Sequence, residues 1–138
     1  MQIKFKKIVP EAVVPKKGTE YSAGYDLTAV SMTYLSSGHI KYGTGIAVEI
    51  PKGYVGLLFP RSSVYKTGTM LANSVGVIDA DFRGEISAIF SHCSERSYQV
   101  GDRVAQLIIM PYPSITYIEV DELSTTERGN GSYGSTGK

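Results

Sequence analysis

The sequence predicts an all-β fold of the β-sandwich, jelly-roll or small-barrel kind, and two observations lead to this prediction. Short runs rich in β-branched and aromatic residues recur along the chain, and Gly, Pro, Ser and Asn separate them. No window longer than ten residues has the apolar period of an amphipathic helix. Many short strands with frequent turns are typical of sandwiches and barrels, whose sheets enclose a common core.

Seven segments have strand character, and each is short. The first alternates lysines with Ile3 and Phe5, so we expect a strand with a wet lysine face rather than an arm that binds nucleic acid. The stretch RSSVYKTG at residues 61–68 has room for one helical turn at most. In chain order, the predicted strands cover residues 3–8, 25–30, 45–50, 54–59, 85–90, 103–110 and 115–120.

Composition and charge exclude several classes of protein. The 138 residues are 42% hydrophobic and 20% charged, as in a single globular domain. A formal net charge of +1 gives no overall field that would attract nucleic acid or an anionic membrane. No apolar run approaches the roughly 18 residues of a membrane-spanning helix. The single cysteine, Cys93, has no internal disulfide partner, which suits a reducing compartment. We therefore expect a protein of the cytoplasm or nucleus, or of the host cytoplasm if the source is a virus.

The C-terminal end of the sequence differs from the rest. From Thr125 onward nearly every residue is Gly, Ser, Thr, Asn or charged, and such a segment has too little apolar surface to order itself. We expect two parts: a folded β domain at residues 1–124 and a flexible, glycine-rich arm at residues 125–138 that becomes ordered only when something holds it.

The arm contains the pattern G-x-G-x-x-G at Gly129, Gly131 and Gly134. A dinucleotide-binding fingerprint needs a helix after these glycines, and only four residues follow Gly134, so we do not expect that fold. A Walker A loop would need glycine at Ser132 and a hydroxyl residue after Lys138. A glycine-rich segment with an arginine, an aromatic ring and hydroxyl groups nevertheless suits a nucleotide.

Three short internal motifs combine polar side chains with turns. AGYDL places Asp26 at the start of a strand, where a carboxylate often only caps a turn. PRSS at residues 60–63 offers a guanidinium, two hydroxyls and backbone N–H groups, which can cradle an anion or form an ordinary turn. GDRVAQ at residues 101–106 carries Arg103 and Gln106 into an apolar strand, where the amide is either a placed donor or a residue of the exposed face.

The longest motif is NSVGVIDADFRGEI at residues 73–86. Asp79 and Asp81 are two positions apart, so on an extended segment both carboxylates point to the same face and can share a metal ion or perform acid–base chemistry. They can also be the polar corners of a hairpin, with Arg83 as a salt partner. The motif by itself leaves both interpretations open.

Together the motifs offer phosphate-binding groups, an amide for a base edge, a carboxylate and an aromatic ring for stacking, which is an inventory for a nucleoside triphosphate. The ordered set AGYDL, PRSS, GVIDADFRGEI, GDRVAQLI and RGNGSYGSTG closely resembles the five motifs of the homotrimeric dUTPases, in the order and spacing of that family. The resemblance spans residues 23–137, nearly the whole chain.

The resemblance implies a jelly-roll-like β-barrel that assembles as a homotrimer, with the C-terminal arm exchanged between subunits. Each active site would draw motifs from different chains. The implied reaction is the Mg²⁺-assisted attack of water on the α-phosphorus of dUTP, which gives dUMP and pyrophosphate. Such an enzyme keeps uracil out of DNA and supplies dUMP for thymidylate synthesis.

The resemblance also implies roles for individual residues. Asp79 would orient and deprotonate the attacking water, with most of the rate enhancement coming from alignment and charge neutralisation. Mg²⁺ would be held by the three phosphates and water without a direct protein ligand, and Asp26 would support the site indirectly. Asn73 and the hairpin backbone would read the uracil edge, and Tyr133 would stack on the base. The implied substrate-binding residues are Arg61, Ser62, Ser63, Asn73, Gly76, Val77, Ile78, Phe82, Gln106, Arg128, Tyr133, Gly134, Ser135 and Thr136.

Two positions depart from the commonest family pattern. Phe82 stands where the family usually has Tyr under the deoxyribose, so the ring that excludes a ribose 2′-hydroxyl is kept and a hydroxyl hydrogen bond is lost. Tyr133 stands where Phe is usual, and its stacking face is kept.

Two other functions are compatible with the same resemblance. A dCTP deaminase needs a general base beside C4 of the pyrimidine, and the hairpin has no carboxylate other than Asp79 and Asp81. A non-enzymatic regulator of the same fold would not need the catalytic aspartate. Ammonia release from dCTP identifies the first alternative, and pyrophosphate release from dUTP separates an enzyme from the second.

Overall fold

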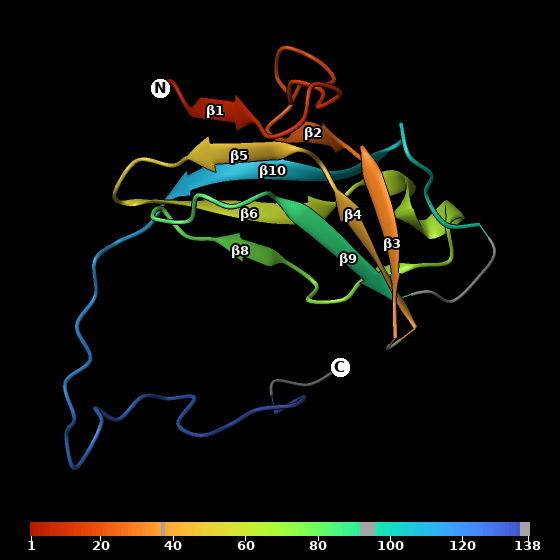
Figure 1. The fold of residues 1–138 in the computed structure, drawn as a ribbon. Helices are drawn as coiled ribbons and strands as arrows, with labels where there is room; N and C mark the ends of the chain where they lie inside the picture. Colours follow the sequence, from red (N-terminus) through yellow and green to blue (C-terminus); the bar gives the residue numbers. More distant parts are fainter. Residues whose placement is uncertain (37, 92–95, 136–138) are drawn as a thin grey trace.

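A computed structural model describes residues 1–36, 38–91 and 96–135. Among these residues, every pair of neighbouring strands is antiparallel, and the one short helix is a 3₁₀ turn, η1 (Ser62–Lys66), where the sequence predicts a single turn. In the part of the chain that the structure describes, no helix is long and apolar enough to cross a membrane. The structure confirms the predicted all-β class (Figure 1).

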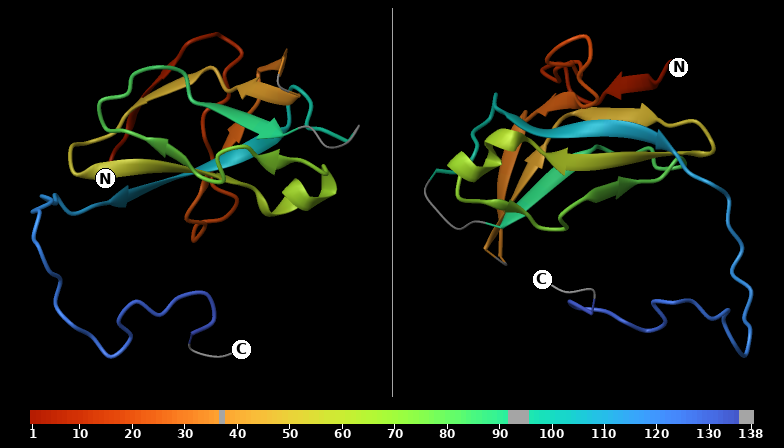
Figure 2. Two further views of the ribbon diagram at one scale, coloured as in Figure 1. Left: turned by 90° about the horizontal axis from the view of Figure 1, so that it is seen from below. Right: turned by 180° about the vertical axis from the view of Figure 1, so that it is seen from behind.

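Two four-stranded sheets form the body, and a two-stranded sheet adds to it. The strands of the second four-stranded sheet run obliquely to those of the first (Figures 1 and 2). This arrangement is a jelly-roll-like fold. The first sheet has the order β2 (Tyr25–Thr28), β10 (Arg103–Pro111), β6 (Tyr54–Pro60) and β8 (Gly76–Ile78). The second has the order β3 (Ser31–Leu35), β4 (His39–Gly43), β9 (Ser87–Ser91) and β7 (Met70–Leu71), and the pair is β1 (Lys4–Lys7) with β5 (Ile46–Glu49).

The core is apolar, and strands of all three sheets contribute residues to it. Tyr42, Phe90 and Tyr98 form a buried aromatic cluster with edge-to-face contacts and ring centroids 5.6–6.2 Å apart. The Tyr42 hydroxyl donates a 2.9 Å hydrogen bond to the carbonyl oxygen of Tyr98. Burial raises the pKa of the Tyr42 phenol above its ordinary value, because the charged form would lose its hydration. Other fully buried side chains are Leu27, Ile40, Ile46, Ile86 and Val104.

The structure confirms six of the seven predicted strands, with ends that differ by one or two residues. The sequence analysis missed β3, β4, β7 and β8. The prediction of a strand at residues 115–120 is wrong for this chain, because that segment is exposed and pairs with no strand among the described residues. An isolated run with strand composition has no partner for its backbone groups, and β-propensity depends on such partners.

The chain leaves the body at the end of β10 and runs beneath it without joining a sheet (Figures 1 and 2). The Tyr112 N–H still donates to the carbonyl oxygen of Gly53 at 3.0 Å. The backbone hydrogen bonds recorded further along connect residues within the segment, such as Gly129 to Thr126 and Gly131 to Arg128. Its large apolar side chains are exposed, as Ile115, Tyr117, Ile118, Val120 and Leu123 show.

Candidate active site

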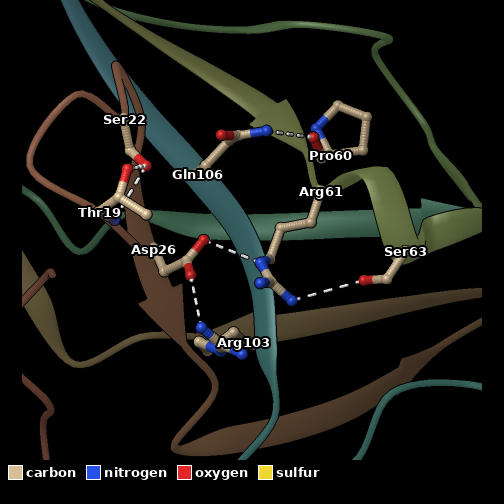
Figure 3. Close-up of polar contacts among 8 residues, drawn as sticks. All are labelled: Thr19, Ser22, Asp26, Pro60, Arg61, Ser63, Arg103 and Gln106. Atoms are coloured by element: carbon tan, nitrogen blue, oxygen red, sulfur yellow. Dashed lines mark hydrogen bonds and ion pairs between the residues drawn. The ribbon is translucent and has the colours of Figure 1, made fainter. Parts of the chain in front are cut away.

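Asp26 lies at the centre of a polar cluster that joins three of the motifs (Figure 3). Its Oδ1 accepts a 2.8 Å hydrogen bond from Nε of Arg61, and its Oδ2 accepts a 3.0 Å bond from a terminal nitrogen of Arg103. The Asp26 side chain is only 14% exposed, so water screens these ion pairs less than it screens surface pairs. The Asp26 carboxylate, for which the sequence left turn capping open, therefore holds two guanidinium groups.

The PRSS turn presents its polar groups where β6 ends and η1 begins. Arg61 is the residue before η1, and its carbonyl oxygen accepts a 2.9 Å bond from Val64 N–H, which closes the turn. A terminal nitrogen of Arg61 donates to Oγ of Ser63 at 3.4 Å. Ser62, the first residue of η1, is exposed. The turn thus combines an oriented guanidinium with two hydroxyls, which is a donor set suited to phosphate oxygens.

Gln106 lies beside this turn because of how the first sheet pairs. It faces Asp26 on β2 and Phe59 on β6, and its Nε2 donates a 3.0 Å hydrogen bond to the carbonyl oxygen of Pro60 (Figure 3). The carboxamide packs over Gly24, where any Cβ would collide with Oε1 and approach Cβ and Cδ of Gln106 to 3.1 Å. Glycine in AGYDL is therefore needed for the close approach of the amide.

The NSVG turn leads into β8, which carries the residues expected to read a base. Asn73, Gly76, Val77 and Ile78 line a common cavity of about 320 Å³. A Cβ on Gly76 would approach Cβ of Leu58 to 3.0 Å, so glycine lets β8 lie close to β6. The turn exposes backbone groups and an amide beside a hollow, which is an arrangement that can form hydrogen bonds with a planar base edge.

The two aspartates of the hairpin lie together and are exposed. Asp79 and Asp81 line a cavity of about 560 Å³ with Tyr54, Val77 and Tyr112. Both residues therefore line the same hollow, but they do so from a turn, closed by a 3.1 Å hydrogen bond from Phe82 N–H to the carbonyl oxygen of Asp79, and not from an extended segment.

Arg83 stabilises the turn of this hairpin through carbonyl groups. One of its terminal nitrogens donates to the carbonyl oxygens of Ala80 and Phe82 at 2.7 and 2.9 Å. The salt pairing that the sequence left open for Arg83 is absent from the ion pairs recorded among the described residues. The half-exposed Phe82 ring packs over Gly84, where a Cβ would come within 2.6 Å of the ring.

The arm residues expected to bind substrate lie on the segment outside the body. Arg128 and Ser135 line a hollow within the arm itself, and Nε of Arg128 donates to the carbonyl oxygen of Gly131 at 3.1 Å. Tyr133 is fully exposed beside Gly134, whose φ of +94° favours glycine. Thr136 lies outside the described residues.

The structure thus places the expected site residues in several groups. Asp26, Arg61, Ser63 and Gln106 share one end of the first sheet, whereas Asn73 and the adjacent β8 residues line a second hollow. Asp79 lines a third, and the arm residues line a fourth. Val77 of β8 lines both the second and the third hollow, whereas neither the phosphate-binding turn nor the arm shares one of these hollows with another group.

The sequence analysis did not assign Arg103 or Gly24 to the site. Arg103 was visible in GDRVAQ, but its partner Asp26 is 77 residues away. Gly24 was visible in AGYDL, but the need for glycine depends on the position of the Gln106 amide.

Across the described ranges, no three side chains of His, Cys, Asp or Glu lie together as a possible metal site. The two carboxylates at the third hollow offer oxygen atoms of the kind that Mg²⁺ prefers, but the ion needs further ligands from water or a bound anion.

Comparison with known proteins identifies the family. The dUTPase family model matches residues 10–137. A deoxyuridine 5'-triphosphate nucleotidohydrolase of Nautilia profundicola is 41% identical over 142 aligned residues, with 100% of both chains covered. The enzyme of the same name from Paramecium bursaria Chlorella virus 1 is 42% identical over 136 residues, covering 96% of this chain and 95% of the relative. The solved structure of a Staphylococcus bacteriophage 80alpha dUTPase with dUPNHPP has a TM-score of 0.84 at 26% identity, with 99% of each chain covered. This chain therefore belongs to the dUTPase family.

Proposed function

We propose that this protein hydrolyses dUTP to dUMP and pyrophosphate, and so keeps uracil out of DNA and supplies dUMP for thymidylate synthesis. The observation that supports this proposal most strongly is a sequence identity of about 40% to deoxyuridine 5'-triphosphate nucleotidohydrolases, over nearly the whole chain. The chain also has a carboxylate and a turn whose donor groups suit phosphate. We place the reaction in the cytoplasm or nucleus, or in the host cytoplasm if the source is a virus.

The proposed active site is shared between three copies of the chain. The separation of the phosphate-binding turn, the hairpin and the arm into different hollows supports this assembly, because one chain does not bring them together. The exposed apolar residues at 115–120 also support it, since a neighbouring subunit would cover them. The 125–138 arm of one subunit would then close over a site formed by the other two.

Asp79 is the proposed general base. It is exposed at the end of β8 and faces a hollow, so its carboxylate can receive a proton from a water molecule placed beside the α-phosphorus. An ionised aspartate is a weak base, so its main contribution is to hold the water in line with the phosphorus. Replacement by an amide would keep the shape of the side chain and remove the proton acceptor.

The hairpin is proposed to select uracil and deoxyribose. Asn73 and the backbone of residues 76–78 would bond to the uracil edge, which differs from cytosine in having a carbonyl oxygen where cytosine has an amino group. The Phe82 ring, held over Gly84, would occupy the space that a ribose 2′-hydroxyl needs. Tyr133 of the arm would stack on the other face of the base.

Arg61, Ser62, Ser63 and Gln106 are proposed to bind the phosphates, joined by Arg128 and by Gly134, Ser135 and Thr136 of the arm. The Asp26 carboxylate takes part indirectly, because it fixes the Arg61 guanidinium. Mg²⁺, held by phosphate oxygens and water, would neutralise charge on the triphosphate. The donor groups of the turn and the arm would supply the rest of that neutralisation.

A panel of dUTP, dTTP, dCTP and UTP with Mg²⁺, scored for pyrophosphate and for ammonia, tests the proposed function. We expect rapid pyrophosphate release from dUTP alone and no ammonia. Ammonia release from dCTP would identify a deaminase instead. Absence of any pyrophosphate from dUTP would identify a non-enzymatic member of the fold.

The Asp79→Asn variant tests the assignment of the base. We expect it to bind a non-hydrolysable dUTP analogue about as tightly as the wild type and to lose nearly all turnover, by roughly 100-fold or more. Substantial residual turnover would remove Asp79 from this role.

A further inference from the structure

We propose that Arg103 is a positioning residue for phosphate binding: by holding one oxygen of Asp26, it keeps the guanidinium of Arg61 turned toward the substrate. The proposal deepens the proposed function and rests on it. The sequence analysis gave Arg103 no role, and the inference comes from the geometry around Asp26.

A β-bulge puts Arg103 on the same face of the sheet as Asp26. In the pairing of β10 with β2, Gln106 faces Asp26 and Ala105 faces Leu27, so regular pairing would place Val104 opposite Thr28. The register instead shifts between Arg103 and Ala105, and Arg103 faces Thr28. Because residues two apart on a strand share a face, Thr28 and its partner lie on the Asp26 face.

The bulge has a clear consequence for both residues that it rearranges. Val104, which regular pairing would turn toward the polar cluster, has no exposed surface and belongs to the core. Arg103, which would otherwise point into the core, reaches the carboxylate with its head group and remains 55% exposed. A one-residue irregularity thus delivers a second guanidinium to a nearly buried carboxylate.

The two arginines divide the oxygens of Asp26 between them (Figure 3). Nε of Arg61 takes Oδ1 at 2.8 Å, and Arg103 takes Oδ2 at 3.0 Å. An arginine facing a carboxylate alone commonly forms two parallel hydrogen bonds to both oxygens. With Arg103 on Oδ2, the hydrogen bond recorded from Arg61 to Asp26 goes to Oδ1 alone.

This division leaves the outer nitrogens of Arg61 available to a ligand. A guanidinium has five N–H donors. Among the described residues, the recorded partners of Arg61 are Asp26 Oδ1 and the Ser63 hydroxyl. Loss of Arg103 would free Oδ2, and Asp26 would then compete with phosphate for a second donor of Arg61. The group would also change from a net charge of +1 to neutral, which weakens anion binding.

Other charged groups near the cluster do not replace Arg103. Lys66, Arg96 and Asp102 line the same hollow as Arg61 and Arg103. The Asp102 carboxylate accepts a 2.8 Å hydrogen bond from Gln99 N–H, which ties it to its own turn. The ion pairs recorded for Asp26 within the described ranges come from Arg61 and Arg103.

The test compares Arg103→Gln, Arg103→Lys and Arg61→Gln with the wild-type protein. Two ligands are used: a non-hydrolysable dUTP analogue, measured by titration calorimetry, and deoxyuridine, which has the base and sugar without phosphate, measured as a competitive inhibitor. We expect Arg103→Gln to weaken analogue binding by roughly tenfold or more and to change deoxyuridine inhibition less than about twofold. Arg103→Lys keeps a cation for Oδ2 and should recover part of the loss.

Two controls complete the design. Lys4→Gln removes a 3.2 Å ion pair with Glu49 that is mostly exposed, and it should leave both ligands unaffected. The double variant Asp26→Asn with Arg103→Gln should bind the analogue no more weakly than the weaker of its two single variants, since both changes act on Arg61.

Three results would overturn the proposal: wild-type affinity for the analogue in Arg103→Gln, equal weakening of both ligands, or additive losses in the double variant. If Arg103→Gln does not fold, the same comparison is made with Arg103→Lys, for which equal weakening of both ligands is again the contradicting result. The wild-type protein and Arg61→Gln report separately on the proposed function. If the wild type does not bind the analogue, the proposed function fails. If the wild type binds it and Arg103→Gln binds it equally well, only the positioning role of Arg103 fails.

Discussion

Replacing Gly24 by alanine perturbs the cluster proposed to bind phosphate without touching any charged group. The added Cβ would collide with Oε1 of Gln106 and would lie 3.1 Å from both its Cβ and its Cδ. The amide oxygen can move because it is at the end of a flexible side chain. The Gln106 Cβ is fixed by the strand, so rotation of the amide alone does not remove the conflict.

The structure gives the size of the expected effect. Displacement of the amide breaks the 3.0 Å hydrogen bond from Gln106 to the carbonyl oxygen of Pro60, which contributes about 1 kcal/mol. An unfavourable rotamer adds about 0.5–1.5 kcal/mol. We therefore expect Gly24→Ala to lower the free energy of unfolding by about 1.5–2.5 kcal/mol. If Gln106 binds phosphate as proposed, the displaced amide would also move away from the phosphates, which should lower kcat/KM by roughly tenfold.

Gly18→Ala is the matched control, because it lies in the same loop and a Cβ there meets only the Ser22 hydroxyl, at an ordinary 3.6 Å. Denaturant unfolding and pyrophosphate release are measured for both variants. In a Gln106→Ala background, Gly24→Ala should lower the free energy of unfolding much less, since the side chain with which the new Cβ collides is gone. Equal behaviour of Gly24→Ala and Gly18→Ala in both assays would refute the reasoning.

Two further predictions concern the core and the arm. Tyr42→Phe should cost about 1 kcal/mol of stability at neutral pH, because the hydrogen bond to the Tyr98 carbonyl is lost. In the wild type, burial raises the pKa of Tyr42, so the stability from its neutral form is present below the ordinary phenol pKa of about 10 and is lost as the pH rises through the higher folded value. The free energy of unfolding, measured from pH 8 to 11, should therefore fall less steeply with rising pH in Tyr42→Phe than in the wild type. Identical slopes for the two proteins would contradict the role of burial. Deleting residues 128–138 should leave the secondary structure by circular dichroism and the oligomeric state by light scattering unchanged while removing most activity, and a truncated protein of full activity would contradict the closing role of the arm.

The body of the fold was predictable where strands carry continuous or alternating apolar residues. β6 and β10 have this pattern, because both lie in the middle of a sheet and contribute to the core. β3 and β4 were not predicted, since their sequences SMTYL and HIKYG mix polar, aromatic and glycine residues without a clear period. The pairing of β3 with β4, and of β4 with β9, provides the stabilisation that local propensity lacks.

The segment at 115–120 shows the opposite case. Its composition favours a strand, but the described part of this chain offers it no partner. A single sequence contains the tendency to form a strand and does not specify whether the partner belongs to the same molecule.

The candidate site was predictable as a set of motifs and not as a geometry. PRSS offered a turn that can cradle an anion, AGYDL a carboxylate and GDRVAQ an amide, and the structure places Asp26, Arg61 and Gln106 together. The link between Asp26 and Arg103 was not predictable, since three positions separate Arg103 from Gln106 and regular alternation would put them on opposite faces. The bulge that reverses this relation is a property of the paired strands.

The most direct test of the shared active site is a mixing experiment between two inactive proteins. Asp79→Asn supplies intact arms and no base, and the protein lacking residues 128–138 supplies the base and no arm. If each site takes its hairpin and its arm from different subunits of a trimer, random exchange at equal concentrations restores both to about a quarter of the sites. We predict that pyrophosphate release from dUTP rises to about a quarter of the wild-type value. No recovery, with subunit exchange demonstrated by mass spectrometry, would contradict a site built from several chains.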